Sequence, residues 1–278
     1  MPAARFTLTV MDEVRVSGLF VYPVKGCRGL ALDAARVGDR GFVHDREWMV
    51  VGPDGGFLSQ RTHPRMALAE VALTDELLVV RAPGMADLVL PLGGGGAARR
   101  PVTIWRDTVE AVSAGPAAAA WFSAFLGLDC ELVRMPATTH RQVEPNRARP
   151  GDLVGFADAY PFLLISQGSL DELNRRLCEP LPMDRFRPNL VVDGCAPHTE
   201  DGWRTFAVGT VTFRVAKPCA RCVVTTVDQR TGERADEPLG TLATYRLRDG
   251  KLLFGQNLIH DGRGMLCLGD RCVVEPLT

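Results

Sequence analysis

The feature that most constrains this chain is a pair of cysteines, Cys219 and Cys222, between two segments rich in β-branched residues. The segment before the pair, Val211–Val215, predicts a strand, and so does the segment after it, Val223–Asp228, because branched side chains favour an extended backbone. A thioredoxin-like cysteine pair instead opens a helix, whose dipole lowers the thiol pKa. The pattern therefore predicts a pair of thiols at the edge of a β-sheet.

Two cations beside the pair, Lys217 and Arg221, favour the thiolate, which is the form that binds metals and attacks electrophiles. The residues alone leave three interpretations open. In the first, both thiols simply pack as small hydrophobic groups. In the second, one of them holds a metal or exchanges electrons. The third is a zinc site completed by Cys267 and Cys272, which fits poorly because four residues separate these two cysteines where two would match.

Length and charge limit the possible partners. The chain has 278 residues with 32 basic and 33 acidic side chains, so it has no overall basic charge for binding nucleic acid. No apolar run approaches the roughly 20 residues of a membrane span, and the segment 1–14 has no apolar stretch of signal-peptide length. Eight cysteines without such a signal predict a reducing compartment. We therefore expect a cytoplasmic protein without membrane or nucleic-acid partners.

The hydrophobic pattern of the first hundred residues predicts short strands between turn residues. The predicted strands are Val14–Tyr22, Glu47–Val51, Ala67–Leu73, Leu77–Arg81 and Leu88–Leu92. The loop Gly93–Gly96 is not expected to bind phosphate, because no Lys-Ser or Lys-Thr follows it.

Three segments predict helices. Pro116–Leu126 has a proline suited to the first helical position and an apolar face, and Gly127 fits its end. Ser169–Glu172 has the form of a capping box, and Pro238–Arg246 predicts a short helix that begins at its proline. The polar segment Ala137–Pro150 is a plausible domain boundary.

A series of segments resembles, in order, the motifs of the MOSC-domain proteins, a family named after the C-terminal domain of molybdenum cofactor sulfurase. Within it the chain is similar to the mitochondrial amidoxime reducing components and their bacterial counterparts. The segments are Val21–Cys27, Asp45–Val50, Gln60–Arg65, Phe186–Asn189, Lys217–Asp228, Glu237–Leu239 and Phe254–Asn257. The resemblance implies an α+β, β-rich fold. An N-terminal MOSC-type β-barrel domain over residues 14–136 would precede a MOSC β-barrel domain with a few short helices over residues 137–278.

The resemblance also implies a pyranopterin molybdenum cofactor. In the amidoxime-reducing relatives the cysteine that ligates the metal matches Cys222, and soft sulfur ligands suit a redox-active metal. An anionic cofactor that carries a phosphate needs fixed cations and planar donors, which arginine supplies best. The residues expected to bind the cofactor are Lys25, Arg46, Asp158, Tyr160, Arg187, Asn189 and Arg221.

The chain departs from the mitochondrial relatives at two places in these motifs. Gly26 stands where they have a serine, and Ala159 and Tyr160 stand where they have a threonine and a serine. Backbone donors can survive both changes, whereas the side-chain contacts cannot. Tyr160 is therefore also a candidate for shaping the substrate pocket.

As a function, the resemblance implies a molybdenum-dependent reductase of N-hydroxylated compounds such as hydroxylamines, amidoximes or N-hydroxylated bases. The sequence has neither a G-x-G-x-x-G fingerprint nor a ferredoxin cysteine cluster. We therefore expect a separate electron-donor protein, of the ferredoxin or cytochrome type with its reductase. Two alternatives stay open: a carrier of sulfur or of molybdenum cofactor without turnover, and a zinc-stabilised binding domain that uses Cys219, Cys222, Cys267 and Cys272.

Overall fold

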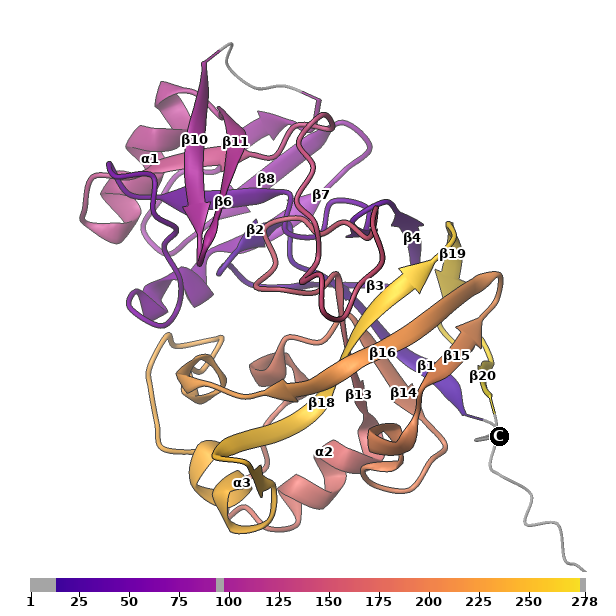
Figure 1. Cartoon of the computed structure of the whole chain (residues 1–278). Coiled ribbons are helices and arrows are strands. Elements are labelled where there is room, and N and C mark those ends of the chain that lie inside the picture. Colours follow the sequence, from indigo (N-terminus) through magenta and orange to yellow (C-terminus); the bar gives the residue numbers. More distant parts are fainter. Residues whose placement is uncertain (1–13, 94–97, 276–278) are drawn as a thin grey trace, which may run out of the picture.

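The computed structural model describes residues 14–93 and 98–275, and Figure 1 shows their arrangement. These residues form twenty strands and three α-helices, so the predicted β-rich α+β class is confirmed. The segment 1–13 and most of the loop Gly93–Gly96, for which predictions are made above, lie outside the described residues. No helix of the described part is long and apolar enough to cross a membrane.

The largest sheet has nine strands in the order β20-β15-β16-β18-β13-β14-β1-β3, with β17 paired to β18. All its pairs are antiparallel except β13 with β14. Because β1 pairs with β14, the start of the chain is part of the same sheet as its C-terminal half. The strands are β1 Arg15–Val21, β3 Leu30–Leu32, β13 Phe162–Ser166, β14 Leu190–Asp193, β15 Thr205–Val208, β16 Val211–Ala220, β17 Leu247–Arg248, β18 Lys251–Asp261 and β20 Cys272–Val274.

Three smaller sheets complete the fold. A five-stranded sheet has the order β10-β11-β12-β6-β2, and the two three-stranded sheets have the orders β19-β4-β5 and β7-β8-β9. Their strands are β2 Val24–Lys25, β4 Ala34–Gly38, β5 Gly41–Phe42, β6 Trp48–Val51, β7 Glu70–Leu73, β8 Leu77–Arg81, β9 Leu88–Pro91, β10 Arg99–Ile104, β11 Asp107–Ser113, β12 Glu131–Arg134 and β19 Gly264–Cys267.

The helix α1, Pro116–Leu126, has the predicted bounds. Pro116 occupies its first turn, and Gly127 ends it in the left-handed conformation with a φ of 72°. The side chains of Trp121, Phe122 and Phe125 are buried and pack with residues of β6, β8 and β12 in one apolar cluster. The apolar face read from the sequence therefore forms the core of the N-terminal half.

The helix α2, Gln167–Asn174, begins one turn earlier than the capping box predicted. Its N-cap is Ser166, whose hydroxyl accepts a hydrogen bond from the Ser169 backbone N–H at 3.1 Å. The Ser169 hydroxyl instead donates to the buried Glu200 carboxylate at 2.7 Å. The helix α3, Leu239–Tyr245, begins just after Pro238, close to the predicted start.

Two predicted strands are wrong in part. The residues after Cys222 form a 3-10 turn, η4 Val223–Thr226, because the hydroxyls of Thr225 and Thr226 donate back to the carbonyls of Cys222 and Val223 at 2.9 and 2.8 Å. The strand expected from Ala67 starts only at Glu70. A second 3-10 turn, η1 Pro64–Leu68, precedes it.

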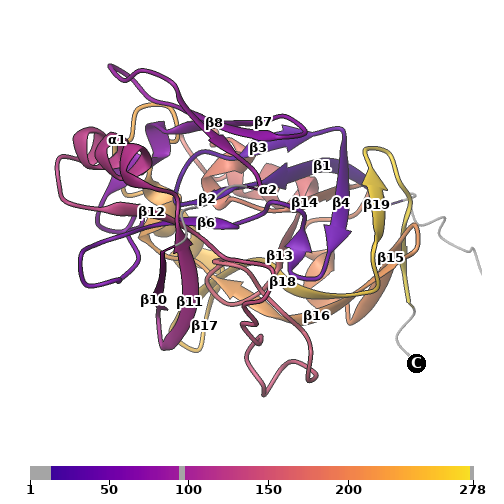
Figure 2. The same ribbon diagram turned by 90° about the horizontal axis from the view of Figure 1, so that it is seen from above.

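The chain passes between the two halves of the molecule after β1, which leads into β2, and again through the segment that joins β12 to β13 (Figures 1 and 2). In Figure 1 the N-terminal sheets and α1 form the upper half, and the large sheet with α2 and α3 forms the lower half. A cluster that includes Ile165, Leu170 and Leu242 packs both helices against the large sheet. The domain boundary predicted within Ala137–Pro150 falls in a segment without strands or helices, and its position stays a prediction.

Candidate functional site

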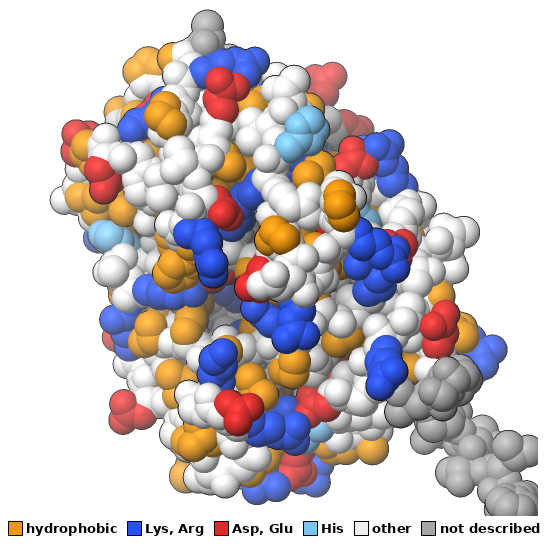
Figure 3. Space-filling view, viewed as in Figure 1, with side chains coloured by type: hydrophobic (Ala, Val, Ile, Leu, Met, Phe, Trp, Pro, Cys, Tyr) orange, Lys and Arg blue, Asp and Glu red, His pale blue; other side chains and the backbone are white. Residues whose placement is uncertain are grey.

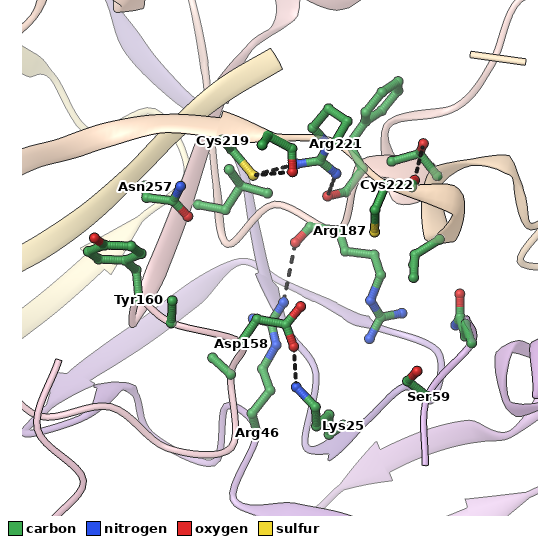
Figure 4. Close-up of a pocket in the computed structure, with 18 of the residues that line it drawn as sticks. Lys25, Arg46, Ser59, Asp158, Tyr160, Arg187, Cys219, Arg221, Cys222 and Asn257 are labelled. Carbon is green, nitrogen blue, oxygen red and sulfur yellow. Dashed lines mark hydrogen bonds and ion pairs between the residues drawn. The ribbon is translucent and has the colours of Figure 1, made fainter. Parts of the chain in front are cut away.

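A pocket of about 180 Å³ lies between the two halves. Figure 3 shows Lys and Arg side chains gathered on this face of the molecule, and Figure 4 shows the pocket closely. Five lining side chains are cationic, whereas one is a carboxylate. The pocket brings together all eight residues that the sequence predicted for the site, namely Lys25, Arg46, Asp158, Tyr160, Arg187, Asn189, Arg221 and Cys222, although their roles stay predictions.

Cys222 lies at the turn between β16 and η4. The strand β16 ends at Ala220, and the carbonyl of Cys222 accepts hydrogen bonds from the N–H and the hydroxyl of Thr225 at 3.0 and 2.9 Å. These bonds fix the backbone of Cys222 and leave its partly exposed thiol directed into the pocket, toward the Arg187 guanidinium (Figure 4).

Cys219, the other cysteine of the pair, is held differently. Arg221 Nη1 donates to its sulfur at 3.1 Å, and Arg221 Nη2 donates to the Phe186 carbonyl at 2.6 Å. Arg221 therefore lines the pocket as predicted, but its terminal nitrogens are occupied by Cys219 and the backbone. The two thiols of the pair have different environments despite their separation of three positions.

Arg46 and Arg187 lie against the ring of Tyr22, with guanidinium carbons 4.1 and 4.3 Å from the ring centroid. Both residues have a positive φ, 46° and 56°, which is uncommon for residues other than glycine. Burial raises the pKa of Tyr22, so the ring is a neutral support for the two cations. The strained backbone and the shared ring place both arginines at one wall of the pocket.

The two arginines differ in their partners. Arg46 Nη1 donates to both oxygens of Asp45 at 2.8 and 2.7 Å and to Asn189 Oδ1 at 2.9 Å. Asn189 is 2% exposed and also donates to the Phe20 carbonyl at 3.1 Å. Because Asn189 is fixed in this way, its hydrogen bond fixes the orientation of the Arg46 guanidinium. Burial raises the pKa of Asp45, and the Arg46 charge opposes that shift.

Arg187 has no carboxylate partner among the described residues. Its one side-chain hydrogen bond goes to Gln229 Oε1 at a long 3.3 Å. Burial lowers the pKa of Arg187 to about 10, so the group is still a cation at neutral pH. A partly buried guanidinium that makes no hydrogen bond to a carboxylate among the described residues fits an anionic group in the pocket.

The buried Lys25 and the half-exposed Asp158 form an ion pair in the pocket. Lys25 Nζ donates to the Asp158 carboxylate and to the Phe156 carbonyl, the latter at 2.8 Å. Burial lowers the pKa of Lys25, and the Asp158 charge opposes this shift. Burial raises the pKa of Asp158, but Lys25 and Arg61 together hold it well below its usual range. Asp158 therefore neutralises the cations around it.

Tyr160 lines the pocket while its hydroxyl points away to Glu144, at 3.0 Å. The same Glu144 oxygen accepts a hydrogen bond from Lys217 Nζ at 3.0 Å, and the Lys217 ammonium lies 5.1 Å from the Tyr160 ring centroid. Burial and the Glu144 carboxylate raise the pKa of Tyr160. The ring, rather than the hydroxyl, is the part of Tyr160 available to the pocket.

Arg61 is a pocket residue that the sequence analysis did not assign, although the motif Gln60–Arg65 contains it. Its guanidinium donates to Asp158 at 2.7 Å. Burial lowers the pKa of Arg61, but Asp158 and an interaction with the Cys222 thiol raise it, and the net shift is upward. The signal that could have found Arg61 is an arginine next to a turn inside a matched motif, as for Arg46.

The zinc alternative requires Cys219, Cys222, Cys267 and Cys272 to converge. Within the residues that the structure describes, no group of three or more His, Cys, Asp or Glu side chains is placed to hold a metal. Cys272 pairs with Val208 beside the first residue of β16, whereas Cys219 lies eight residues further along that strand. At roughly 3.3 Å per strand residue this separation is far beyond coordination distance, so the zinc alternative is wrong.

Together, the strand-rich fold and the cationic, thiol-containing pocket between its halves define the class of protein. Residues 13–129 match the family pattern of the MOSC N-terminal beta barrel domain, and residues 152–273 match that of the MOSC domain. The chain belongs to the MOSC-domain family, as the resemblance of its motifs predicted.

The relatives of the chain include two kinds of protein. It is 36% identical over 275 residues to mitochondrial amidoxime-reducing component 1 of Mus musculus, covering 92% of this chain and 80% of that protein. It is 32% identical over 266 residues to molybdenum cofactor sulfurase of Oryza sativa subsp. japonica, covering 88% of this chain and 32% of that protein. The solved YuaD protein of Bacillus subtilis aligns with 95% of this chain and 97% of its own, at 13% identity and a TM-score of 0.44. The names of the first two support a function related to the molybdenum cofactor.

Proposed function

We propose that this protein is a molybdenum-cofactor-dependent reductase of N-hydroxylated compounds that takes its electrons from a separate donor protein. The observation that carries the proposal is the presence in one pocket of the Cys222 thiol and the Arg187 guanidinium, which makes no hydrogen bond to a carboxylate among the described residues. A relative at 36% identity bears the name amidoxime-reducing component, which supports the choice of substrate class.

The residues of the pocket fit a pyranopterin molybdenum cofactor. Cys222 would supply a soft sulfur ligand to the metal, and Arg187 would meet an anionic part of the cofactor without competition from a carboxylate. Arg46 and Lys25 would add charge from groups that Asp45 and Asp158 already hold in place. The bound cofactor would supply the redox chemistry that removes the oxygen from nitrogen.

The protein side chains have two tasks in such a reaction. They orient the substrate above the thiol, and they stabilise negative charge as it develops on the oxygen that leaves nitrogen. Arg61 is a cation within the same pocket and is placed for the second task, whereas the terminal nitrogens of Arg221 are engaged by Cys219 and the Phe186 carbonyl. The ring of Tyr160 and the side chain of Asn257 form part of the wall that a substrate would contact.

The test is reduction of benzamidoxime by the protein purified after expression with molybdate. Chemically reduced methyl viologen should support turnover, and NADH or NADPH alone should not, because the chain has no fingerprint for a nicotinamide. Adding a ferredoxin or cytochrome with its reductase should restore turnover driven by nicotinamide. Molybdenum in the protein without reduction of any N-hydroxylated compound would contradict the proposal. That result would favour a cofactor or sulfur carrier, the role that the name of the sulfurase relative suggests.

A further inference from the structure

Trp105 is a half-exposed indole at the tip of the hairpin formed by β10 and β11. The pairing of Ile104 with Asp107 leaves Trp105 and Arg106 as the turn. Trp105 is 51% exposed, whereas the other three tryptophans, Trp48, Trp121 and Trp203, are at most 8% exposed. The hairpin belongs to the upper half of the molecule, and its turn end points toward the lower half (Figure 1).

The backbone of Trp105 is strained. Its φ is 58°, in the left-handed region that favours glycine, and the first turn residue of a tight hairpin is a position where glycine is common. A bulky residue there costs on the order of 1–2 kcal/mol, and the exposed indole gains little from burial. Two of the other residues with a positive φ, Arg46 and Arg187, line the pocket. Strain held in place by surrounding contacts is typical of functional sites.

Contacts connect Trp105 to the pocket. The Arg61 guanidinium carbon lies 4.7 Å from the indole centroid, and the ring of Phe57 meets the indole edge with centroids 5.1 Å apart. Arg61 is itself a lining residue of the pocket, as is Cys222, and its guanidinium donates to Asp158 at 2.7 Å. The wall of the pocket therefore continues outward from Cys222 through Arg61 to an indole with exposed surface.

We propose that Trp105 is an aromatic platform at the mouth of the substrate site, which selects N-hydroxylated compounds whose N–O group is attached to a planar ring. This inference rests on the reductase function proposed for the same pocket. A flat ring can stack on the exposed indole while the attached N–O group reaches past Arg61 toward Cys222. An aliphatic compound of the same class reaches the pocket without that contact.

Binding can be measured without turnover. Acrylamide quenches the fluorescence of an exposed tryptophan, so Trp105 supplies most of the quenchable signal. Benzamidoxime should protect this signal from acrylamide, whereas acetamidoxime at the same fractional saturation should not. Calorimetric titration should show that Trp105→Gly weakens binding of benzamidoxime about threefold to tenfold, as the loss of one aromatic contact predicts. Equal protection by both ligands, or unchanged affinity in Trp105→Gly, would overturn the inference.

Kinetics then separate this inference from the proposed function. In Trp105→Gly the ratio of kcat/KM for benzamidoxime to that for acetamidoxime should fall about threefold to tenfold, and Trp105→Phe should restore most of it. Glycine suits the positive φ, so the turn should fold, which the melting temperature checks. Val89→Ala removes another half-exposed apolar side chain, on β9, and should leave the ratio unchanged.

The possible failures are distinguishable. Protection of Trp105 by benzamidoxime without any turnover would contradict the reductase function and leave the aromatic platform standing. Turnover with the same ratio of kcat/KM for benzamidoxime to that for acetamidoxime in wild type and Trp105→Gly would support the reductase function and overturn the aromatic platform. A fall in molybdenum content in Trp105→Gly would show that the indole contacts the cofactor instead, which also overturns the inference.

Discussion

The charged groups of the pocket form two sets, which we call the paired side and the open side according to whether the cation has a carboxylate partner rather than by position. On the paired side, the cations Lys25 and Arg46 are joined to the carboxylates Asp158 and Asp45. On the open side, Arg187 has no carboxylate partner within the described residues, and the Cys222 thiol faces it across the pocket. Since the paired charges satisfy one another, they can build the site in the absence of a ligand. The open side has charge and sulfur left to bind one.

The largest expected effect is the difference in reductase activity between variants of the two cysteines. Cys222→Ser should reduce reductase activity to background, because a serine oxygen is a harder ligand with different redox properties. Cys219→Ser should keep most of the activity, because the Cys219 sulfur is already engaged by Arg221 at 3.1 Å. Initial rates with benzamidoxime and reduced methyl viologen, normalised to molybdenum content, measure both variants. Equal loss in both with the cofactor retained would indicate a dithiol mechanism instead.

The paired side should matter most for stability. Arg46→Ala leaves the buried Asp45 carboxylate without its cation, and breaking a buried ion pair costs about 3–5 kcal/mol of the free energy of unfolding. Urea denaturation measures this cost. Adding Asp45→Asn to Arg46→Ala should recover part of it, because the uncompensated charge is then gone. A single variant as stable as wild type would show that the pair is not structurally important.

Substitution on the open side should weaken cofactor binding without lowering the free energy of unfolding. Arg187→Met removes a cation that pays a cost of burial without a hydrogen-bonded carboxylate partner among the described residues, so the free energy of unfolding of the cofactor-free protein should stay constant or rise. Cofactor affinity should fall about tenfold to a hundredfold, the effect of losing one charge-assisted hydrogen bond. Molybdenum content at limiting cofactor measures this loss, and Arg187→Lys should restore it only in part, because the planar donor geometry is absent. Full occupancy in Arg187→Met would contradict an anion-binding role.

The smallest effect concerns pH. Lys25 and Arg61 hold the pKa of Asp158 below its unfolded value of 3.8, so this carboxylate stabilises the fold above about pH 4. That contribution is lost as the pH falls through the folded-state pKa. The difference in free energy of unfolding between wild type and Asp158→Asn should therefore be constant from pH 7 to 5 and shrink below about pH 4. A difference that instead grows on acidification would reverse the sign of the assigned interaction.

The sequence predicted the strand-rich class, the bounds of α1 and the gathering of eight residues in one pocket. Those predictions rest on local signals, such as Pro116 and Gly127 at the ends of α1, or on motifs long enough to align. The sequence did not predict that η4 follows Cys222, because branched residues favour strands and only the threonine hydroxyls reveal the turn.

The division into a paired and an open side was also beyond the sequence. Arg46 and Arg187 lie in equivalent-looking motifs, and the presence of Asp45 beside Arg46 was the one available hint of a neutralising partner. Which cation stays uncompensated depends on contacts between segments about 140 positions apart, such as Arg46 with Asn189. Trp105 gave no signal at all, since its position next to Arg61 follows from how the β10–β11 hairpin lies on the rest of the fold.

The central claim is that the open side of this pocket holds a molybdenum cofactor. Elemental analysis of the protein purified after expression with molybdate tests it most directly, with molybdenum and zinc measured in the same sample. We expect molybdenum approaching one atom per chain in wild type, little zinc, and a strongly reduced molybdenum content in Arg187→Met. Wild-type protein that contains stoichiometric zinc and no molybdenum would contradict the account.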